Sequence, residues 1–142
     1  MGTTLISAVI RGNEVFIANT GDSRAALIRE GRTIARTIDH SLVQRLIEEG
    51  RITEEEAFGH PASNYITSAI GGRNPLRVDL YRWPARPGDV LIMSTDGLHD
   101  YVRWDKIEEL SKAGNAREIA FKLLERALEV TRDNVTIAVW KW

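Results

Sequence analysis

The stretch from Val90 to Asp100 places the tightest constraint on how this chain can fold. Its first four residues, 90–93, are all apolar and follow a Pro-Gly pair, which predicts a short strand buried on both faces. The chain then becomes polar and places Asp96 directly before Gly97. A carboxylate at the end of a buried strand is costly to desolvate unless a cation or strong hydrogen-bond donors meet it. Asp96 therefore either caps the next turn or helix, or helps to hold a cation.

Length and composition indicate an ordinary globular domain. The chain has 142 residues, of which 43% are hydrophobic and 27% charged, so we expect a single domain at 1–142 with a sizeable core. The formal net charge of -1 argues against nucleic acid as a partner. The apolar runs are too short to span a bilayer and no signal peptide opens the chain. We therefore expect a cytoplasmic protein without a membrane partner.

The side chains available for catalysis or metal binding are restricted. The chain has no cysteine, which excludes disulfides, thiol nucleophiles and zinc-thiolate sites. It has three histidines, too few for a His-rich transition-metal site. Any bound metal must rely on carboxylates, and oxygen ligands suit magnesium, manganese or calcium.

Four short β-like runs open the chain and are joined by turns rich in Gly, Asn and Asp. Runs of this kind are typical of strands, and glycine and asparagine tolerate the positive φ of a tight hairpin. We predict an antiparallel meander over this part of the chain. Its strands are expected at residues 5–10, 15–19, 25–28 and 33–38.

Two capping signals follow and predict two helices. Ser41 with Gln44 precedes an apolar helical stripe that ends at Gly50. Thr53 with Glu56 repeats the signal almost immediately, so a second short helix is expected there.

The rest of the chain alternates between loops, strands and helices. Residues 58–72 are typical of a loop, either a mobile lid or a plain surface connection, with one helical turn at 65–70. Alternating polarity over 76–81 predicts a half-buried strand that ends before Pro84. The remaining expected elements are a helix at 104–110, a longer helix capped by Asn115 and Glu118, and a strand at 135–140.

Three aspartates stand where a β-run meets a turn: Asp22, Asp96 and Asp133. If the strand ends coincide at one edge of a sheet, these carboxylates come together and repel one another unless a cation compensates them. A divalent metal would do so, and a metal-bound water is a nucleophile near neutral pH. The alternative is that Asp22 and Asp133 only initiate turns by bonding to nearby backbone amides.

Three further side chains are weaker candidates. His40 either orients a carboxylate or phosphate, or only packs at a helix start. His99 either assists Asp96 as a neighbouring or general-acid group, or is an exposed turn residue. Arg24 either binds phosphate or pairs with an acid, and pairing is the commoner use of such a residue.

Five motifs follow one another over essentially the whole chain: Met1-Gly2-Thr3-Thr4-Leu5, Ile17-Ala18-Asn19-Thr20-Gly21-Asp22-Ser23-Arg24, Asp39-His40-Ser41-Leu42, Ser94-Thr95-Asp96-Gly97-Leu98 and Asp133-Asn134. Together they resemble a known family, the metal-dependent type-2C (PPM) serine/threonine protein phosphatases, in particular the compact bacterial and archaeal kind. The order and approximate spacing of the motifs agree with those of the family, which makes the resemblance specific.

The resemblance implies an α+β fold, an α-β-β-α sandwich of two antiparallel sheets flanked by helices. It implies that Asp96 and Asp133 hold one metal of a central pair, Mn2+ or Mg2+, and that Asp22 shares a third, weaker metal with Asp96. The segment at about 46–72 matches a flap beside the active site. The implied reaction is hydrolysis of phosphoserine or phosphothreonine in a phosphoprotein substrate by a metal-activated water, without a phosphoenzyme intermediate.

The chain departs from the family at its N-terminus. In the family, the motif matching Met1 to Leu5 follows a region with the Asp-Gly pair that bridges the central metals, another acid, and an arginine that binds phosphate. We therefore expect an N-terminally truncated domain, a partial PPM-type phosphatase domain. Unpaired sheet edges invite association, so we expect self-association through open edges.

Two functions remain open at this point. The first is a phosphatase domain that acts when its N-terminal part is supplied, which the surviving acids favour. The second is a catalytically inactive binding or assembly module of the same fold, which the absent bridging aspartate and phosphate arginine favour.

Overall fold

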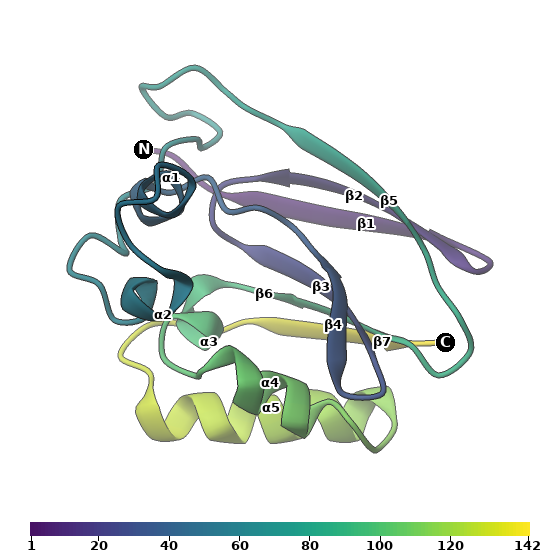
Figure 1. The fold of residues 1–142 in the computed structure, drawn as a ribbon. Coiled ribbons are helices and arrows are strands. Elements are labelled where there is room, and N and C mark those ends of the chain that lie inside the picture. The colour runs from purple at the N-terminus through teal and green to yellow at the C-terminus, as the bar shows by residue number, and fades with distance from the viewer.

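The computed structural model describes residues 1–142 and contains two antiparallel sheets with helices beside them (Figure 1). The expected α+β fold of two antiparallel sheets with helices is confirmed. The three-stranded sheet has the order β1 (Leu5–Arg11), β2 (Glu14–Thr20), β5 (Asp79–Pro84). The four-stranded sheet has the order β4 (Arg32–Arg36), β3 (Arg24–Arg29), β6 (Val90–Ser94), β7 (Ile137–Lys141). The helices are α1 (Leu42–Glu48), α2 (Glu54–Ala57), α3 (Asp96–His99), α4 (Trp104–Leu110) and α5 (Ala116–Val130).

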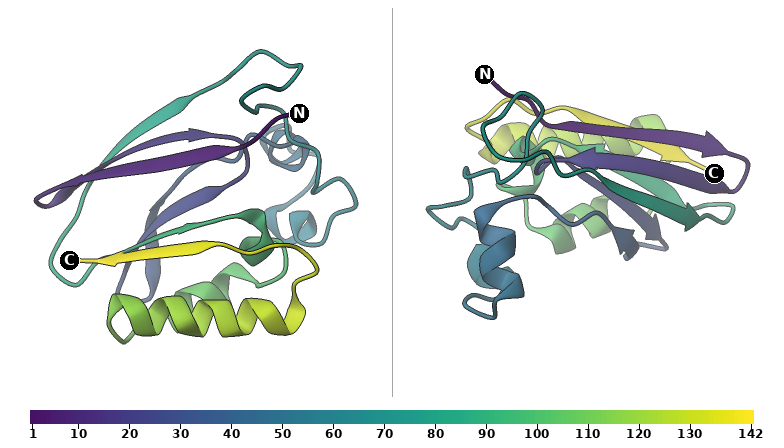
Figure 2. Two further views of the ribbon diagram at one scale, coloured as in Figure 1. Left: turned by 180° about the vertical axis from the view of Figure 1, so that it is seen from behind. Right: turned by 90° about the horizontal axis from the view of Figure 1, so that it is seen from above.

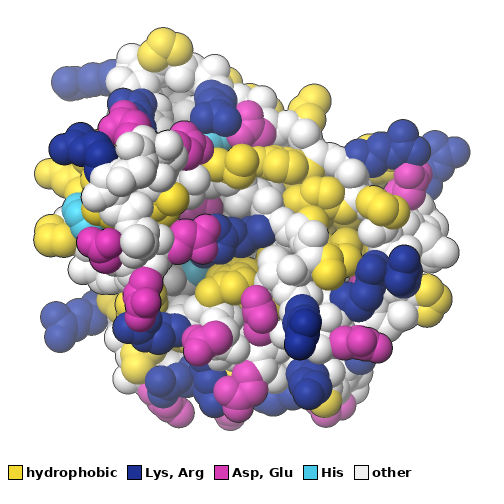
Figure 3. Space-filling view, in the orientation of Figure 1, with side chains coloured by type: hydrophobic (Ala, Val, Ile, Leu, Met, Phe, Trp, Pro, Cys, Tyr) yellow, Lys and Arg dark blue, Asp and Glu magenta, His cyan; other side chains and the backbone are white.

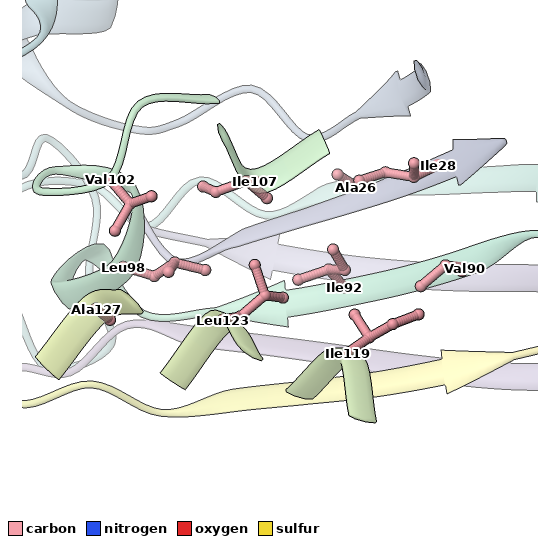
Figure 4. Packing of buried hydrophobic residues seen from close by; sticks show 10 residues of the cluster. All are labelled: Ala26, Ile28, Val90, Ile92, Leu98, Val102, Ile107, Ile119, Leu123 and Ala127. Carbon is pink, nitrogen blue, oxygen red and sulfur yellow. The ribbon is translucent and has the colours of Figure 1, made fainter. Parts of the chain in front are cut away.

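The four-stranded sheet is packed on both faces. In β3, alternate residues enter two separate cores, because successive side chains of a strand point to opposite faces. Leu27 belongs to the core between the two sheets, and Ile28 to the core between this sheet and the helices. Figure 4 shows this second core, in which Ile119 and Leu123 of α5 face Ile92 of β6. The prediction of a doubly buried strand at 90–93 is confirmed for its first three residues, and Met93 is half-buried.

The three-stranded sheet is packed on its inner face only. Its inward side chains, among them Val15 and Ile17, join the core between the sheets. Its outward side chains include Leu5, Val9 and Leu80, which are 53%, 65% and 78% exposed. In the view from above, no helix lies over this sheet (Figure 2). One layer of helices therefore covers one sheet, and the other sheet has a bare apolar face.

Local signals explain the helix boundaries. The side chain of Ser41 accepts a hydrogen bond from the Gln44 backbone, and Thr53 and Glu56 form a complete capping box. Asn115 caps α5 through the Glu118 backbone N–H. The predicted helix at 104–110 coincides with α4.

Three predictions of local structure are wrong. The opening meander is broken, since β2 and β3 lie in different sheets and do not pair. The helical turn at 65–70 is absent, and residues there make isolated bridges to Thr3 and Ser41. The strand predicted at 76–81 begins at Asp79 and includes Pro84, because its inward residues are the aromatic Tyr81 and Trp83. Pro84 ends a strand at the edge of its sheet, where the missing N–H is tolerated.

None of the helices combines the length and the hydropathy that crossing a bilayer requires. Their longest member, α5, instead uses one apolar stripe to cover the four-stranded sheet.

Candidate functional site

The three predicted acids lie at one end of the four-stranded sheet. Asp22 stands two residues before β3, Asp96 two residues after β6, and Asp133 four residues before β7. In the antiparallel register, Ser94 at the end of β6 pairs with Arg24 of β3 on one side and with Ile137 of β7 on the other. The starts of β3 and β7 therefore lie beside the end of β6. This places the three acids at the same edge of the sheet.

A close backbone approach joins the segments of Asp96 and Asp133. A Cβ on Gly97 would overlap the backbone oxygen of Asn134, so only glycine fits at this position. The backbone N–H of Thr95 donates to the Thr136 carbonyl at 3.1 Å. In return, the Thr136 N–H donates to Oγ1 of Thr95 at 3.0 Å.

A second buried contact holds the turn that carries Asp22. The N–H of Gly21 donates to Nδ1 of His40 at 3.1 Å, and Nε2 of His40 lies 2.9 Å from Oδ2 of Asp79. Gly21 has a φ of 104°, in the left-handed region that favours glycine. His40 is therefore a fully packed connector between the turn and β5, and it does orient a carboxylate, that of Asp79.

The electrostatics show that the acids interact. Burial, and next the charge of Asp133, raises the pKa of Asp96. Burial, followed by the charge of Asp96, raises the pKa of Asp22 to about 7. Asp100 behaves in the same way, with a pKa raised to about 7 by burial and by Asp96. These acids thus form one negatively charged group whose repulsion a cation would relieve.

Asp100 was missed by the sequence reasoning. It follows Asp96 by four residues across α3, and its backbone N–H donates to the Asp96 carbonyl at 2.9 Å. Residues four apart lie on the same side of a helical turn. The spacing Asp96-x-x-x-Asp100 at a strand end was therefore a readable signal for a fourth acid.

The acids fit a hard divalent cation in their chemistry and charge, but they do not form a complete cage. No group of three or more His, Asp or Glu side chains converges closely enough to hold a metal ion. Asp133 is exposed, and its Oδ1 accepts a hydrogen bond from the Asn134 N–H at 2.7 Å, as the turn interpretation predicts. The chain thus offers a partial set of oxygen ligands, since Mg2+ and Ca2+ each take at least six.

A half-buried ion pair lies beside the acids. Nε and Nη2 of Arg24 donate to Oδ1 and Oδ2 of Asp39 at 3.1 and 2.6 Å, so Arg24 pairs with an acid. Burial raises the pKa of Asp39, but the charge and hydrogen bonds of Arg24 outweigh burial and lower it below the ordinary value. Both nitrogens of His99 lack a hydrogen-bond partner, and its Nε2 is 4.0 Å from Oδ2 of Asp39.

His99 is not the exposed turn residue that was expected. Its side chain is 1% exposed because α3 turns it inward. Burial, and next the charge of Arg24, lowers the pKa of His99 to about 3. His99 is therefore neutral at physiological pH and contributes no cation to the site.

A cavity of about 300 Å³ connects these groups with α1 and α2. Asp22, Asp39, His99 and Asp100 line one part of its wall. Residues from the segment at 46–72, including Glu54 and Phe58, line another part. Acidic and basic side chains lie close together in the left half of the face in Figure 3, where Figure 1 places α1, α2 and α3.

Comparisons with known proteins agree with the sequence motifs. The family described as "Protein phosphatase 2C" matches residues 1–68. A "Putative protein phosphatase 2C-type" from Streptococcus pyogenes serotype M6 is 38% identical over 141 residues, which are 98% of this chain and 57% of the relative.

Solved structures of serine/threonine phosphatases are also similar. Stp1 from Staphylococcus aureus superposes with a TM-score of 0.92 at 38% identity, covering 100% of this chain and 57% of Stp1. The catalytic domain of PstP, in complex with 2 manganese ions, has a TM-score of 0.83 at 38% identity, covering 98% of this chain and 58% of that domain. The chain thus spans less than two thirds of the proteins that it matches.

Proposed function

Because this chain belongs to the protein phosphatase 2C family, we propose that it supplies the C-terminal part of the catalytic domain of a metal-dependent serine/threonine protein phosphatase. The observation that supports this function is the position of Asp22, Asp96, Asp100 and Asp133 at one sheet edge. Burial and mutual repulsion raise the pKa values of Asp22, Asp96 and Asp100 there. The substrate is a phosphoprotein, and the segment at about 46–72 is the flap beside the site. A cytoplasmic location stays a prediction from the sequence.

We assign the metal ligands as the resemblance implies. Asp96 and Asp133 hold one metal of a central pair, and Asp22 shares a third metal with Asp96. The raised pKa of Asp96 and Asp22 supports this assignment, because a bound cation would remove the repulsion that causes the shifts. Mn2+ and Mg2+ both suit carboxylate ligands, and manganese is present in the PstP structure.

Asp96, Asp133 and Asp22 would hold metal ions, which would lower the pKa of a bound water molecule. In the proposed hydrolysis the water oxygen would bond to phosphorus as the bond to the serine or threonine oxygen breaks, and a proton of the water would pass to that leaving oxygen. The residues of this chain hold the geometry for that reaction. Gly97 lets the Asp96 and Asp133 segments meet, and His40 fixes the turn that carries Asp22.

A catalytically inactive binding or assembly module is the second candidate. The observation in its favour is that no three potential ligands converge in this chain. A divalent cation held by two carboxylates alone is bound weakly, because most of its coordination positions remain with water.

A chimera separates the two candidates. This chain would replace the matching 57% of Stp1, and turnover of p-nitrophenyl phosphate and of a phosphopeptide would be measured in excess manganese. The phosphatase proposal expects turnover that Asp96→Asn or Asp133→Asn abolishes, with Glu129→Gln on the exposed side of α5 as the unchanged control.

A folded chimera without turnover would overturn the phosphatase proposal and favour the binding module. The isolated chain is measured in parallel with the same substrates and by manganese-dependent thermal shift. A thermal shift that Asp96→Asn removes would support metal binding by the chain itself.

A further inference from the structure

Two arginines at the cavity have incomplete anionic partners. Arg36 makes one hydrogen bond, from its Nη2 to Oε1 of Glu54 at 3.4 Å. Nη1 of Arg103 lies 4.0 Å from Oε1 of Glu55. Both glutamates are exposed, at 70% and 86% of their side chains. Arg24 in the same cavity, by contrast, makes two hydrogen bonds to the half-buried Asp39.

Aromatic rings hold both arginines in place. The guanidinium carbon of Arg36 lies 5.4 Å from the ring centre of Trp104, and that of Arg103 lies 4.6 Å from the ring centre of Phe58. Trp104 is itself fixed, since its Nε1 donates to Oγ1 of Thr33 at 2.7 Å. The two guanidinium groups are therefore presented with their donors positioned before any ligand arrives.

The charge of Arg36 is poorly compensated. Burial, and next the charge of Arg24, lowers the pKa of Arg36 from its ordinary value. A guanidinium has five N–H donors and binds a carboxylate best with two of them. Arg36 uses one donor for its long hydrogen bond to Glu54, so several donors are left for a second anion.

The other acids that line the cavity have partners or roles elsewhere. Asp22 and Asp100 belong to the candidate metal centre, and Asp39 is paired with Arg24. Asp105 accepts a hydrogen bond from the Lys106 N–H. The charged groups that remain at the cavity are the two arginines and the two glutamates of α2.

We propose that Arg36 and Arg103 form a subsite for acidic side chains next to the phosphorylated residue of a protein substrate. This inference rests on the proposed function, and it adds a preference for acidic sequences. The ligand chemistry follows from the chain itself, because both arginines already face carboxylates. Glu54 and Glu55 occupy the subsite in the free chain and are displaced when the acidic segment of a substrate binds.

Displacing the glutamates costs little, because each pair is long and has an exposed glutamate as one member. An incoming carboxylate could accept hydrogen bonds from Arg36 on both of its oxygens. These bonds would be shorter and better aligned than the present bond to Glu54. The release of α2 at the same time would open the cavity on the side of the flap.

Peptide binding to the chain itself tests this proposal without requiring turnover. A short fluorescein-labelled peptide with two glutamates after a serine is compared by anisotropy with versions carrying two glutamines or two lysines, at low and high salt. We expect the glutamate peptide to bind about tenfold more tightly than the glutamine peptide at low salt, a difference of about 1.4 kcal/mol, and less at high salt.

Two double variants distinguish the roles. Arg36→Gln with Arg103→Gln should remove the preference for glutamate, whereas Glu54→Gln with Glu55→Gln should strengthen binding of the acidic peptide. The matched control is Arg73→Gln with Arg117→Gln, exposed arginines outside the cavity, which should change nothing. Thr53 and Glu56 are unchanged in all variants, so the capping box of α2 is retained.

Three outcomes would overturn the subsite: equal binding of the glutamate and glutamine peptides, tighter binding of the lysine peptide, or an unchanged preference in the arginine variant with a native circular dichroism spectrum. The chimera assay reports separately on the phosphatase proposal. Failure of one proposal is therefore visible independently of the other.

Discussion

The two sheets of this molecule are both antiparallel, but their strand patterns and surroundings differ. Buried and exposed side chains alternate along β1 and β5 of the three-stranded sheet, whereas β3 and β6 of the four-stranded sheet are buried on both faces. Helices α4 and α5 cover the outer face of the four-stranded sheet only. The four-stranded sheet also carries Asp22, Asp96 and Asp133 at the ends of its strands. A site needs supports that do not move, and backbone packed on both faces provides them. The candidate metal ligands therefore lie on the sheet that is packed on both faces.

The largest expected effect comes from opening the core under α5. Leu123 is 0% exposed, and Leu123→Ala should lower the free energy of unfolding by about 2–5 kcal/mol through lost burial and a cavity. The matched change on the bare face is Leu80→Ala, where a 78% exposed side chain should change stability by less than about 0.5 kcal/mol. Urea unfolding of both variants measures the contrast, and similar losses would show that the bare face is packed in solution.

The next effect comes from the glycine between Asp96 and Asp133. Gly97→Ala forces the backbone of Asn134 to move and should cost about 1–3 kcal/mol, the usual range for overpacking. It should also weaken any manganese-dependent thermal shift. The control is Gly12→Ala in the β1–β2 hairpin, where the added methyl group meets nothing within 4 Å and only the positive φ is strained. An unchanged thermal shift in Gly97→Ala would remove the link between this approach and the metal ligands.

A pH titration of the metal-free chain comes next. Burial and the charge of Asp96 raise the pKa of Asp22 and Asp100 to about 7, so the folded chain holds protons that the unfolded chain has lost. These groups lower stability as the pH rises from about 4 to 7. The lowered pKa of His99, caused by burial and Arg24, opposes them with one proton below about pH 6. For these three groups the net expected loss between pH 4 and 6 is about 1.4 kcal/mol per pH unit, and the raised pKa of Asp96 adds to it.

Urea unfolding in the presence of a chelator, at pH 5 and at pH 7, measures whether stability falls as the pH rises. The double variant Asp22→Asn with Asp100→Asn should flatten or reverse the dependence. Asp79 of the three-stranded sheet is the contrast. Burial raises its pKa, but hydrogen bonds from His40 and Arg77 outweigh burial and lower it, so its contribution changes below pH 4. A native chain that gains stability between pH 5 and 7 would contradict the assignment.

The smallest effect on stability is expected for substitutions on the bare outer face of the three-stranded sheet. These substitutions also test whether the chain associates with itself. We propose that the open edges and apolar outer face of the three-stranded sheet associate with a second copy, as unpaired strands and exposed apolar patches tend to do. Val9→Lys with Leu80→Lys should change stability by less than about 1 kcal/mol and convert oligomers to monomers in sedimentation experiments. A wild-type monomer at high concentration would refute the association.

Much of the site could be predicted because its signals are local. Asp96 follows a doubly buried strand and Asp133 precedes the last strand of the chain. The structure has both aspartates at these strand ends. The electrostatic partners of Asp22 were harder to predict, since the place of Asp100 near it depends on how α3 turns after β6. The burial of His99 depends on the same turn, which is why its exposed alternative could not be rejected from the sequence.

The division into two sheets could not be predicted from the strand pattern. The turn from Thr20 to Arg24 has the composition of a hairpin turn, yet it carries the chain from one sheet to the other. Pairing is decided by long-range burial, here of Leu27 against Leu91 across β3 and β6. Likewise, Tyr81 and Trp83 take the inner face of β5 because their larger area gains more from burial.

The last residue of the chain is fastened to the first hairpin, and this contact affects the order of folding. Nε1 of Trp142 donates to the Gly12 carbonyl at 2.8 Å, across 130 positions of sequence. Contacts of such separation form late, because the intervening chain must first lose the entropy of a very long loop. The first hairpin therefore makes this contact only after β7 has been synthesised, although most of its own core partners come earlier in the chain.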